Sequence, residues 1–345
     1  MKLSSSYLFS LAALLGLTYA DNYTKEIFTV NVTDDIERNY SVHGHTCDIE
    51  MQYFSGSITS DVFNGETRPG SSTVYKKFKD GSIEGRARYV LLGNDSKGEC
   101  DLFIEDNSLY RDGQSVITKP TIITTCEDLA WLQTADLQGR VETQGNTKTV
   151  KIMWNESDVI MPYPTVDIPV VDKVYDKEIF TFDIGIASQV DVIGPDNALA
   201  VMVGFTCTSD AENFKATGLD TFYDTRMQFK NQIQTLSARY ILTGKDDEGR
   251  ESTVYIENTG VDDFTQMLTI PHIVTDNPKW AWMETAPLFG TTSWDPNLRI
   301  HLWTVNDPTL WTEQPVESED ELDIEVDDNV QVDENNDDSD SDQEN

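Results

Sequence analysis

The amino-acid sequence predicts an all-β fold of two tandem antiparallel, lipocalin-like β-barrel domains. The first observation is an internal repeat. Ala87-Arg-Tyr-Val-Leu-Leu-Gly93 returns as Ala238-Arg-Tyr-Ile-Leu-Thr-Gly244, at an offset of 151 residues because 238 − 87 = 151. Lys25-Glu-Ile-Phe-Thr29 returns in the same way as Lys177-Glu-Ile-Phe-Thr181. A nearly constant offset over the length of a domain indicates two copies of one domain.

The second observation is the β pattern inside each copy. Residues 237–243 and 252–258 are short runs of strand-favouring residues, and the segment between them has the Gly-containing chemistry of a turn. Copy one repeats this predicted hairpin around the loop 94–98. No segment sustains a helical apolar period for more than two turns, and closure into a barrel removes the unpaired edges of a lone sheet. Further strands are predicted at 27–32, 49–57, 122–125, 150–154, 180–186, 199–206, 270–275 and 299–305.

The repeat and the changes in composition divide the chain into five predicted segments. They are a signal peptide at 1–20, a first barrel at 21–156, a connector at 157–174, a second barrel at 175–307 and a disordered acidic tail at 308–345. The connector contains Pro162, Pro164 and Pro169, which favour an extended and rather stiff backbone.

The N-terminus has the layout of a secretory signal peptide. Lys2 precedes the apolar stretch 8–17, and small residues stand at Thr18 and Ala20, the positions that a signal peptidase reads. The apolar stretch is shorter than the roughly 20 residues that span a bilayer, and no later segment is long and apolar enough to cross one. The sequence therefore predicts a secreted, extracellular or cell-wall protein without a membrane span.

Two further features suit an oxidising compartment. Five glycosylation sequons occur, all in the first half of the chain, at Asn22, Asn31, Asn39, Asn94 and Asn155. Glycans there would cover copy one and leave copy two as the contact surface. The four cysteines suggest two disulfides, and we expect Cys100–Cys126 within copy one and Cys47–Cys207 between the copies; four buried thiols are the alternative.

The charge of the chain limits its partners. The net charge is −36, from 61 acidic and 25 basic residues, so nucleic acid and anionic membrane surfaces would be repelled. Much of this charge lies in the tail, which we expect to act as a solubilising segment. Weak Ca²⁺ binding or docking of a basic protein are the alternatives, and the tail has no EF-hand loop.

The hairpin and the segment that follows it carry a family resemblance. Ala238-Arg-Tyr-Ile-Leu-Thr243, Val254-Tyr-Ile-Glu-Asn-Thr-Gly260, Thr269-Ile-Pro-His272 and Asn277-Pro-Lys-Trp-Ala-Trp-Met283 resemble the domain-of-unknown-function 3237 family, also called uncharacterised protein family 0311. Copy one is similar at Phe54-Ser-Gly56, Asn64-Gly-Glu66, Pro69-Gly70 and Lys79-Asp-Gly81. The resemblance implies a β-barrel in each copy and no established activity. Copy one has Asp-Leu-Ala-Trp131 in place of Lys-Trp-Ala-Trp.

The residues offer candidates for a binding site but no catalytic constellation. No Gly-x-Ser-x-Gly elbow occurs, and His43-Gly-His45-Thr-Cys47 supplies three metal-ligating residue types where a structural zinc site wants four. We therefore expect no metal and no cofactor. Arginine, histidine, carboxylate and aromatic side chains at matching positions of the repeat are candidates for lining a barrel mouth, with buried core pairing as the alternative. These candidates are Arg88, Tyr89, Trp131, Arg239, Tyr240, Tyr255, His272, Trp280, Trp282 and Glu284.

Three function classes remain open from the sequence. We favour a non-enzymatic protein that binds a small molecule or a glycan, because barrel mouths commonly hold ligands. The first alternative is a metal-independent hydrolase, lyase or cyclase that uses Arg239, Tyr240, His272 and Glu284 in copy two. The second is a structural or surface protein that acts through its acidic tail and glycans.

Overall fold

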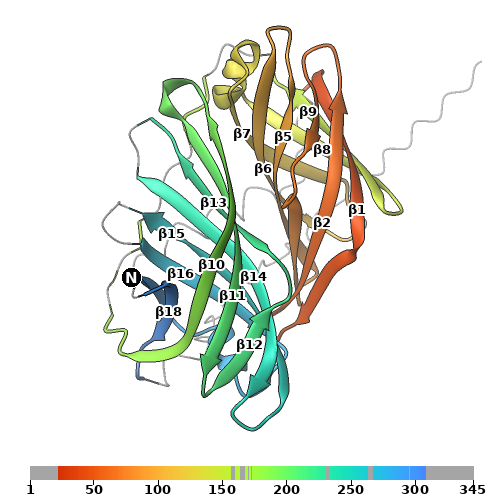
Figure 1. The fold of residues 1–345 in the computed structure, drawn as a ribbon. Helices are drawn as coiled ribbons and strands as arrows, with labels where there is room; N and C mark the ends of the chain where they lie inside the picture. Colours follow the sequence, from red (N-terminus) through yellow and green to blue (C-terminus); the bar gives the residue numbers. More distant parts are fainter. Residues whose placement is uncertain are drawn as a thin grey trace, which may run out of the picture. The chain divides into compact units, whose positions relative to one another are not determined.

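The structure is a computed structural model, and it describes residues 22–156, 160–163, 168–169, 171, 173–230, 233–262, 267–294 and 296–307. The predicted signal peptide, the acidic tail and parts of the connector lie outside the described residues. Within these residues the fold is almost entirely β, which confirms the predicted fold class. In Figure 1 the strands of each half of the chain curve around into a barrel, red to yellow for the first and green to blue for the second.

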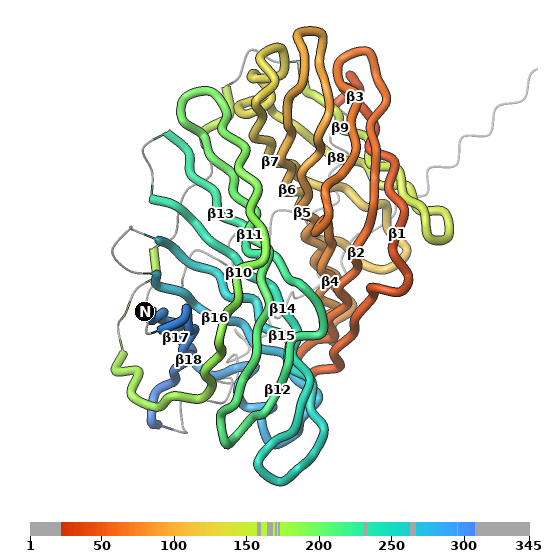
Figure 2. Tube along the Cα trace, in the orientation of Figure 1, coloured from red at the N-terminus to blue at the C-terminus, as the bar shows by residue number. Residues whose placement is uncertain are grey.

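The first sheet closes on itself. Its strands pair in the order β1-β9-β8-β7-β6-β5-β3-β2, and a β1–β2 pairing completes the circle. A further strand, β4, pairs with both β2 and β5, so β3 and β4 share the gap between those two strands (Figure 2). The strands are β1 (Lys25–His43), β2 (Cys47–Thr59), β3 (Asn64–Thr67), β4 (Ser72–Phe78), β5 (Ser82–Asn94), β6 (Glu99–Arg111), β7 (Val116–Thr124), β8 (Leu137–Gln144) and β9 (Thr147–Trp154).

The second sheet repeats this topology strand for strand. Its order is β10-β18-β17-β16-β15-β14-β12-β11, with β10–β11 closing the circle and β13 pairing with β11 and β14. The short helices η2 (Glu127–Thr134) and η4 (Ala281–Glu284) occupy equivalent places, and η3 (Pro195–Asn197) lies between β10 and β11. The strands are β10 (Lys177–Ile193), β11 (Leu199–Ala211), β12 (Phe214–Gly218), β13 (Phe222–Gln228), β14 (Gln234–Asp246), β15 (Glu251–Asp262), β16 (Met267–Thr275), β17 (Leu288–Trp294) and β18 (Leu298–Thr304).

The paired Ala-Arg-Tyr segments lie on β5 and β14, and each forms the predicted hairpin with the following strand. Because successive side chains of a strand point to opposite faces, Ala87 and Tyr89 point into the first barrel while Arg86 and Arg88 point outward. In β14, Tyr240 packs against Phe182 and Phe205 in the apolar core of the second barrel. The same alternation therefore gives each barrel inward-facing Ala and Tyr side chains and an outward-facing arginine.

The outer faces of the two barrels pack against each other. Ile49, Met51 and Tyr53 of β2 join an apolar cluster with Ile241 and Tyr255 of the second barrel. A second cluster joins outer residues of β5, β6 and β7 to β11 and to Phe229. Burial of this much apolar surface stabilises the pairing of the barrels by the hydrophobic effect.

Reciprocal arginines show that the interface has approximate two-fold symmetry. Arg88 Nη1 donates a hydrogen bond of 2.8 Å to the carbonyl of Ser237, and Arg239 Nη1 donates one of 3.0 Å to the carbonyl of Arg86. Arg88 and Arg239 are equivalent in the repeat, and so are Arg86 and Ser237. The duplicated domain therefore contacts its own copy through the same outer face on both sides, as the subunits of a homodimer do.

The disulfide Cys100–Cys126 is present, as predicted, and joins the start of β6 to the residue that precedes η2. The predicted Cys47–Cys207 disulfide is wrong, since both residues are free and buried. Cys207 lies on the inner face of β11, near Gly218 and the core residue Tyr240. Cys47 lies in the interface outside the second barrel, beside Thr46, so the barrel wall separates the two thiols.

These two thiols give a direct chemical prediction. Burial raises the pKa of Cys207 to about 12 and also raises that of Cys47, so neither thiolate forms near neutral pH. We expect iodoacetamide to modify no cysteine in the native protein and two cysteines after denaturation without reductant. Mass spectrometry of the alkylated peptides would locate both labels at Cys47 and Cys207. Alkylation of Cys100 or Cys126 in unreduced protein would contradict the pairing.

Four of the five sequon asparagines are exposed in the structure, and Asn155 is half-buried, with Nδ2 donating to Asp136 at 3.2 Å. No helix among the described residues is long and apolar enough to cross a membrane.

Candidate functional site

The ten candidate site residues lie in separate parts of the molecule. Arg88, Arg239, Tyr255 and His272 are on the outer faces that form the interface between the barrels. Tyr89 is inside the first barrel, and Tyr240 and Trp280 are inside the second. Trp131 is exposed and packs against Trp154, with ring centroids 4.7 Å apart, while Trp282 is half-buried beneath Lys177. The candidates of neither copy therefore gather at the mouth of their barrel, and Arg88 and Arg239 instead have the buried pairing that was the alternative.

The candidates at the interface between the barrels belong to an ionic cluster whose charges pair with one another. Glu257 forms ion pairs with Arg239 at 3.0 Å, with Arg86 at 3.3 Å and with Lys76. Burial alone would raise the pKa of Glu257, but these three cations hold it well below its usual range. Burial, aided by Lys76, lowers the pKa of His272 to about 3, so this imidazole is neutral.

Glu284 joins the two copies by holding a turn. Its carboxylate accepts hydrogen bonds from the backbone N–H of His45 at 2.9 Å and of Thr46 at 2.7 Å, and another from the Thr46 hydroxyl at 2.7 Å. The equivalent residue of copy one, Gln133, donates at 3.4 Å to the carbonyl of Pro195 in the turn between β10 and β11. The buried Glu284 carboxylate therefore fixes the turn between β1 and β2. This turn carries the His43-Gly-His45 segment, which lies at the interface as a result.

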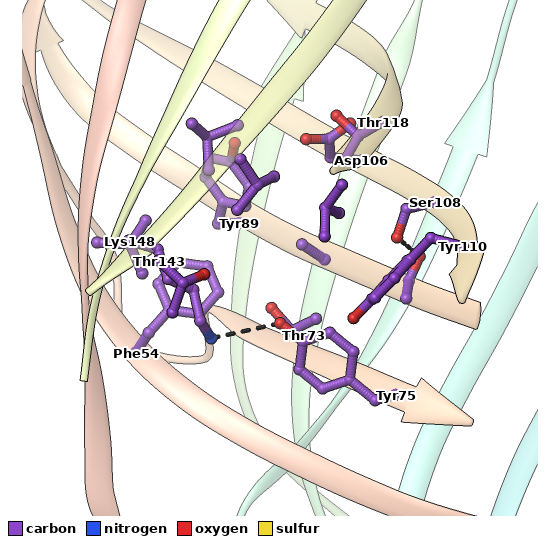
Figure 3. Close-up of a pocket in the computed structure, with 16 residues that line it drawn as sticks. Phe54, Thr73, Tyr75, Tyr89, Asp106, Ser108, Tyr110, Thr118, Thr143 and Lys148 are labelled. Atoms are coloured by element: carbon purple, nitrogen blue, oxygen red, sulfur yellow. Dashed lines mark hydrogen bonds between the residues drawn. The ribbon is translucent and has the colours of Figure 1, made fainter. Parts of the chain in front are cut away.

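A cavity inside the first barrel brings polar groups together where the sequence analysis named only Tyr89. It has a volume of about 80 Å³ and is lined by inward-facing residues of eight of the nine strands. Figure 3 draws these side chains, with Phe54, Tyr75, Tyr110 and Lys148 around the space and Asp106 beside Thr118 at one end. The lining residues are Val32, Phe54, Thr73, Tyr75, Gly85, Ala87, Tyr89, Asp106, Ser108, Tyr110, Val116, Thr118, Val141, Thr143, Lys148 and Val150.

The deep end of the cavity holds buried polar atoms that lack hydrogen-bond partners in the described part of the chain. Two of them are Asp106 Oδ1 and the Tyr89 hydroxyl, while the Thr118 hydroxyl lies beside the Asp106 carboxyl group and interacts with it. Asp106 is 5 % exposed and Tyr89 is 2 % exposed. Buried polar atoms are normally paired because an unpaired one loses its hydration without compensation. The equivalent Tyr240 hydroxyl and Asn258 Oδ1 of the second barrel are also unpaired within the described residues, so it is the cavity beside these atoms that distinguishes the first barrel.

The carboxyl group of Asp106 titrates near neutral pH. Burial raises its pKa from the ordinary value of 3.8 to about 7, and the neighbouring Thr118 offsets only part of that rise. Burial also raises the pKa of Tyr89 well above its usual value, so this phenol keeps its proton. Asp106 can therefore accept or donate a hydrogen bond around pH 7, while Tyr89 supplies a fixed hydroxyl.

The backbone beneath Asp106 has room only for glycine. A side-chain carbon at Gly139 of β8 would lie 1.8 Å from the Thr118 hydroxyl oxygen and 3.2 Å from Asp106 Oδ2. The second barrel repeats this arrangement, with Gly290 beneath Thr269 and Asn258. Glycine at both positions thus lets the strand carrying it approach the polar pair closely.

Lys148 stands on the cavity wall with its charge already compensated. Its ammonium group donates to Asp34 Oδ1 at 2.9 Å, to Gln52 Oε1 at 2.9 Å and to the Tyr75 hydroxyl at 3.3 Å. Burial opposes the charge, but Tyr75 and Asp34 more than offset it and raise the pKa of Lys148. An ammonium group has three N–H donors, and these three hydrogen bonds use all of them.

The two barrels differ at the cavity. Leu236 takes the position of Gly85 in copy two. Gly85 pairs with Ser108 on the neighbouring strand, whereas Leu236 pairs with Gly260. The position of Asp106 is taken by Asn258, and that of Lys148 by Leu298, which pairs with Ile184 as Lys148 pairs with Val32. The second copy has thus replaced a titratable carboxyl group by an amide and two small or polar lining residues by leucines.

Sequence reasoning missed Asp106, Lys148, Tyr75, Tyr110 and Thr118. The signal for Asp106 was available, because Glu105 and Glu257 match in the repeat while the next pair, Asp106 and Asn258, does not. A systematic comparison of inward positions between the copies would have found it.

The comparisons with known proteins give no assignment. No protein-family model matches the chain, and no curated protein matches it. Twelve solved chains are similar to part of it, and they include the following three. One is a protein of unknown function from Clostridium acetobutylicum, with 19% identity, a TM-score of 0.34, and coverage of 38% of this chain and 96% of that one. Another is a conserved protein of unknown function from Rhodopseudomonas palustris, with 14% identity, a TM-score of 0.33, and coverage of 38% and 95%. The third is a β-barrel-like protein from Acinetobacter baumannii, with 10% identity, a TM-score of 0.31, and coverage of 36% and 91%.

Proposed function

We propose that the chain is a non-enzymatic binding protein whose first barrel holds a small molecule, with the second barrel serving as its structural partner. The observation that carries this proposal is the cavity in the first barrel, with Asp106 Oδ1 and the Tyr89 hydroxyl buried and unpaired at its deep end. Ligand sites combine mostly apolar walls with a few polar groups of this kind. The small volume suits one end of a ligand whose remainder extends past the half-buried Tyr110 toward solvent.

We also propose that the chain is a secreted glycoprotein related to the domain-of-unknown-function 3237 family. The Cys100–Cys126 disulfide and the exposed asparagines of four sequons support the secretory part. Enzymatic deglycosylation followed by mass measurement tests the glycosylation. A protein that is unmodified at all five sequons would contradict the proposal that glycans cover the first copy.

The enzyme alternative in copy two has less support. Arg239 and Tyr240 are successive residues of β14, so their side chains point to opposite faces of the barrel wall. Glu284 is engaged by the turn between β1 and β2, and Arg239 by Glu257. A single substrate could not contact Arg239 and Tyr240 together.

Filling the cavity with the residues of copy two tests the proposed function. We expect Gly85→Leu/Ser108→Gly to remove ligand binding, because the leucine side chain enters the space while loss of the Ser108 side chain relieves the contact of 2.6 Å that a carbon at Gly85 would make. Native mass spectrometry of the purified full chain measures the retained ligand. We expect one adduct per chain in the unmodified protein and at least a tenfold smaller bound fraction in the variant.

Leu92→Thr is the matched control, since Leu92 lies on the same strand but is 41 % exposed. It should leave the adduct unchanged. An adduct that persists in the cavity-filled variant, with its melting temperature unchanged, would place the ligand elsewhere and contradict the proposal.

A further inference from the structure

The polar groups of the cavity differ in what they still lack. The donors of Lys148 are taken by Asp34, Gln52 and Tyr75. At the opposite end, Asp106 Oδ1 accepts no hydrogen bond from the described residues, although it is buried. The cavity therefore lacks a hydrogen-bond donor opposite the Asp106 carboxylate. An anionic ligand would find no free cationic donor on the Lys148 side.

The walls favour a donor that carries positive charge. Four aromatic rings, those of Phe54, Tyr75, Tyr89 and Tyr110, line the same space. Aromatic faces attract cations through the ring quadrupole, and a hydrogen bond between a cationic donor and a carboxylate is about twice as strong as a neutral one. The strongly negative net charge of the chain, −36, also raises the local concentration of cations.

We infer that the first barrel binds a primary amine as its ammonium cation, with the ammonium group against Asp106 and the alkyl part directed along the aromatic walls toward the open end. This inference rests on the proposed function and names its ligand class. The second barrel does not share this selectivity, because Asn258 replaces the carboxylate at the equivalent position.

The charged and titratable groups around Asp106 define how binding depends on pH. They are Tyr75 of β4, Tyr89 of β5, Tyr110 of its own strand β6, and Lys148 of β9 with its partner Asp34 of β1. Burial raises the pKa of Tyr110 to about 12, and Tyr89 and Lys148 also keep their protons. Asp106 is thus the group that changes charge near pH 7, and binding of an ammonium requires its ionised form.

Isothermal titration calorimetry of the full chain with n-butylamine, 1-butanol and butyrate tests the inference. These probes share a carbon chain and differ in charge. At pH 8 we expect butylamine to bind at least tenfold more tightly than either of the others. Its affinity should rise through pH 7 and fall above about pH 10, where an alkylammonium loses its proton. Titrations at pH 7 in buffers of different ionisation enthalpy should show release of about half a proton per bound amine, because a group at its pKa is half protonated.

Asp106→Asn is the decisive variant, since copy two folds with asparagine in this position. We expect butylamine to bind it at least tenfold more weakly, without proton release, while its melting temperature shows that it is folded. Equal binding of butylamine by this variant, or tighter binding of 1-butanol or butyrate by the unmodified protein, would overturn the inference.

The outcomes separate the inference from the proposed function. Binding of 1-butanol or butyrate that is lost in Gly85→Leu/Ser108→Gly would keep the cavity as a ligand site and reject the amine. Absence of binding by all three probes, together with a purified protein that carries no adduct, would reject both.

Discussion

Asp106→Asn should make the protein more stable at pH 8 than the unmodified chain. The reason is the raised pKa of Asp106, about 7 in the folded protein against an ordinary value of 3.8. A group whose folded pKa is raised binds more protons in the folded state, so stability falls as pH rises from about 4 to about 7 and then stays level. Asparagine removes this loss, because it presents a neutral side chain at every pH.

The free energy of unfolding should rise by up to about 4 kcal/mol above pH 7, because the pKa differs by about 3 and one pKa unit corresponds to about 1.4 kcal/mol. Near pH 4 the two proteins should unfold at similar urea concentrations. Urea unfolding followed between pH 4 and pH 8 measures the difference, with the exposed Asp61 changed to Asn as the control. A constant difference across this range would show that Asp106 is ionised throughout.

Glu257→Gln should have the largest destabilising effect. The substitution leaves Lys76, Arg86 and Arg239 in a buried interface without their shared carboxylate. Breaking a buried ion pair by removing one partner typically costs about 3–5 kcal/mol, because the remaining charge stays buried and uncompensated. The free energy of unfolding at pH 7.5, measured in urea with the disulfide intact, should fall by about that amount.

Glu105→Gln is the matched comparison, because Glu105 occupies the equivalent position in copy one and forms its ion pair with Arg88 at 2.9 Å. We expect it to be less destabilising than Glu257→Gln by at least about 1 kcal/mol, since one cation rather than three loses an ion pair. Equal losses would show that the asymmetry in ion pairing has no energetic weight.

The fold was predictable from the sequence because its signals are local and repeated. The Ala-Arg-Tyr segments combine strand-favouring residues with a following turn, and each strand pairs with its neighbour in the chain. The closure of each barrel followed from the physical cost of unpaired edges. The Cys100–Cys126 disulfide was also predicted correctly, because it joins neighbouring parts of one copy.

The arrangement of the barrels was not predictable, and it determined the outcome for the candidate residues. A sequence shows that Arg239 and Tyr240 face opposite sides of a strand, but not that the outer side is covered by another copy of the domain. The same packing separates Cys47 from Cys207 and recruits Glu284 to a turn in the other copy. The cavity escaped notice for a related reason, because it joins single residues from eight strands that lie far apart in the chain.

A crystal structure of the full chain with n-butylamine bound tests the central claim most directly. The account predicts one amine per chain inside the first barrel, with its nitrogen within hydrogen-bond distance of Asp106 and its chain beside Tyr75 and Tyr110. Amine density inside the second barrel or between the barrels, with the first cavity holding none, would contradict it.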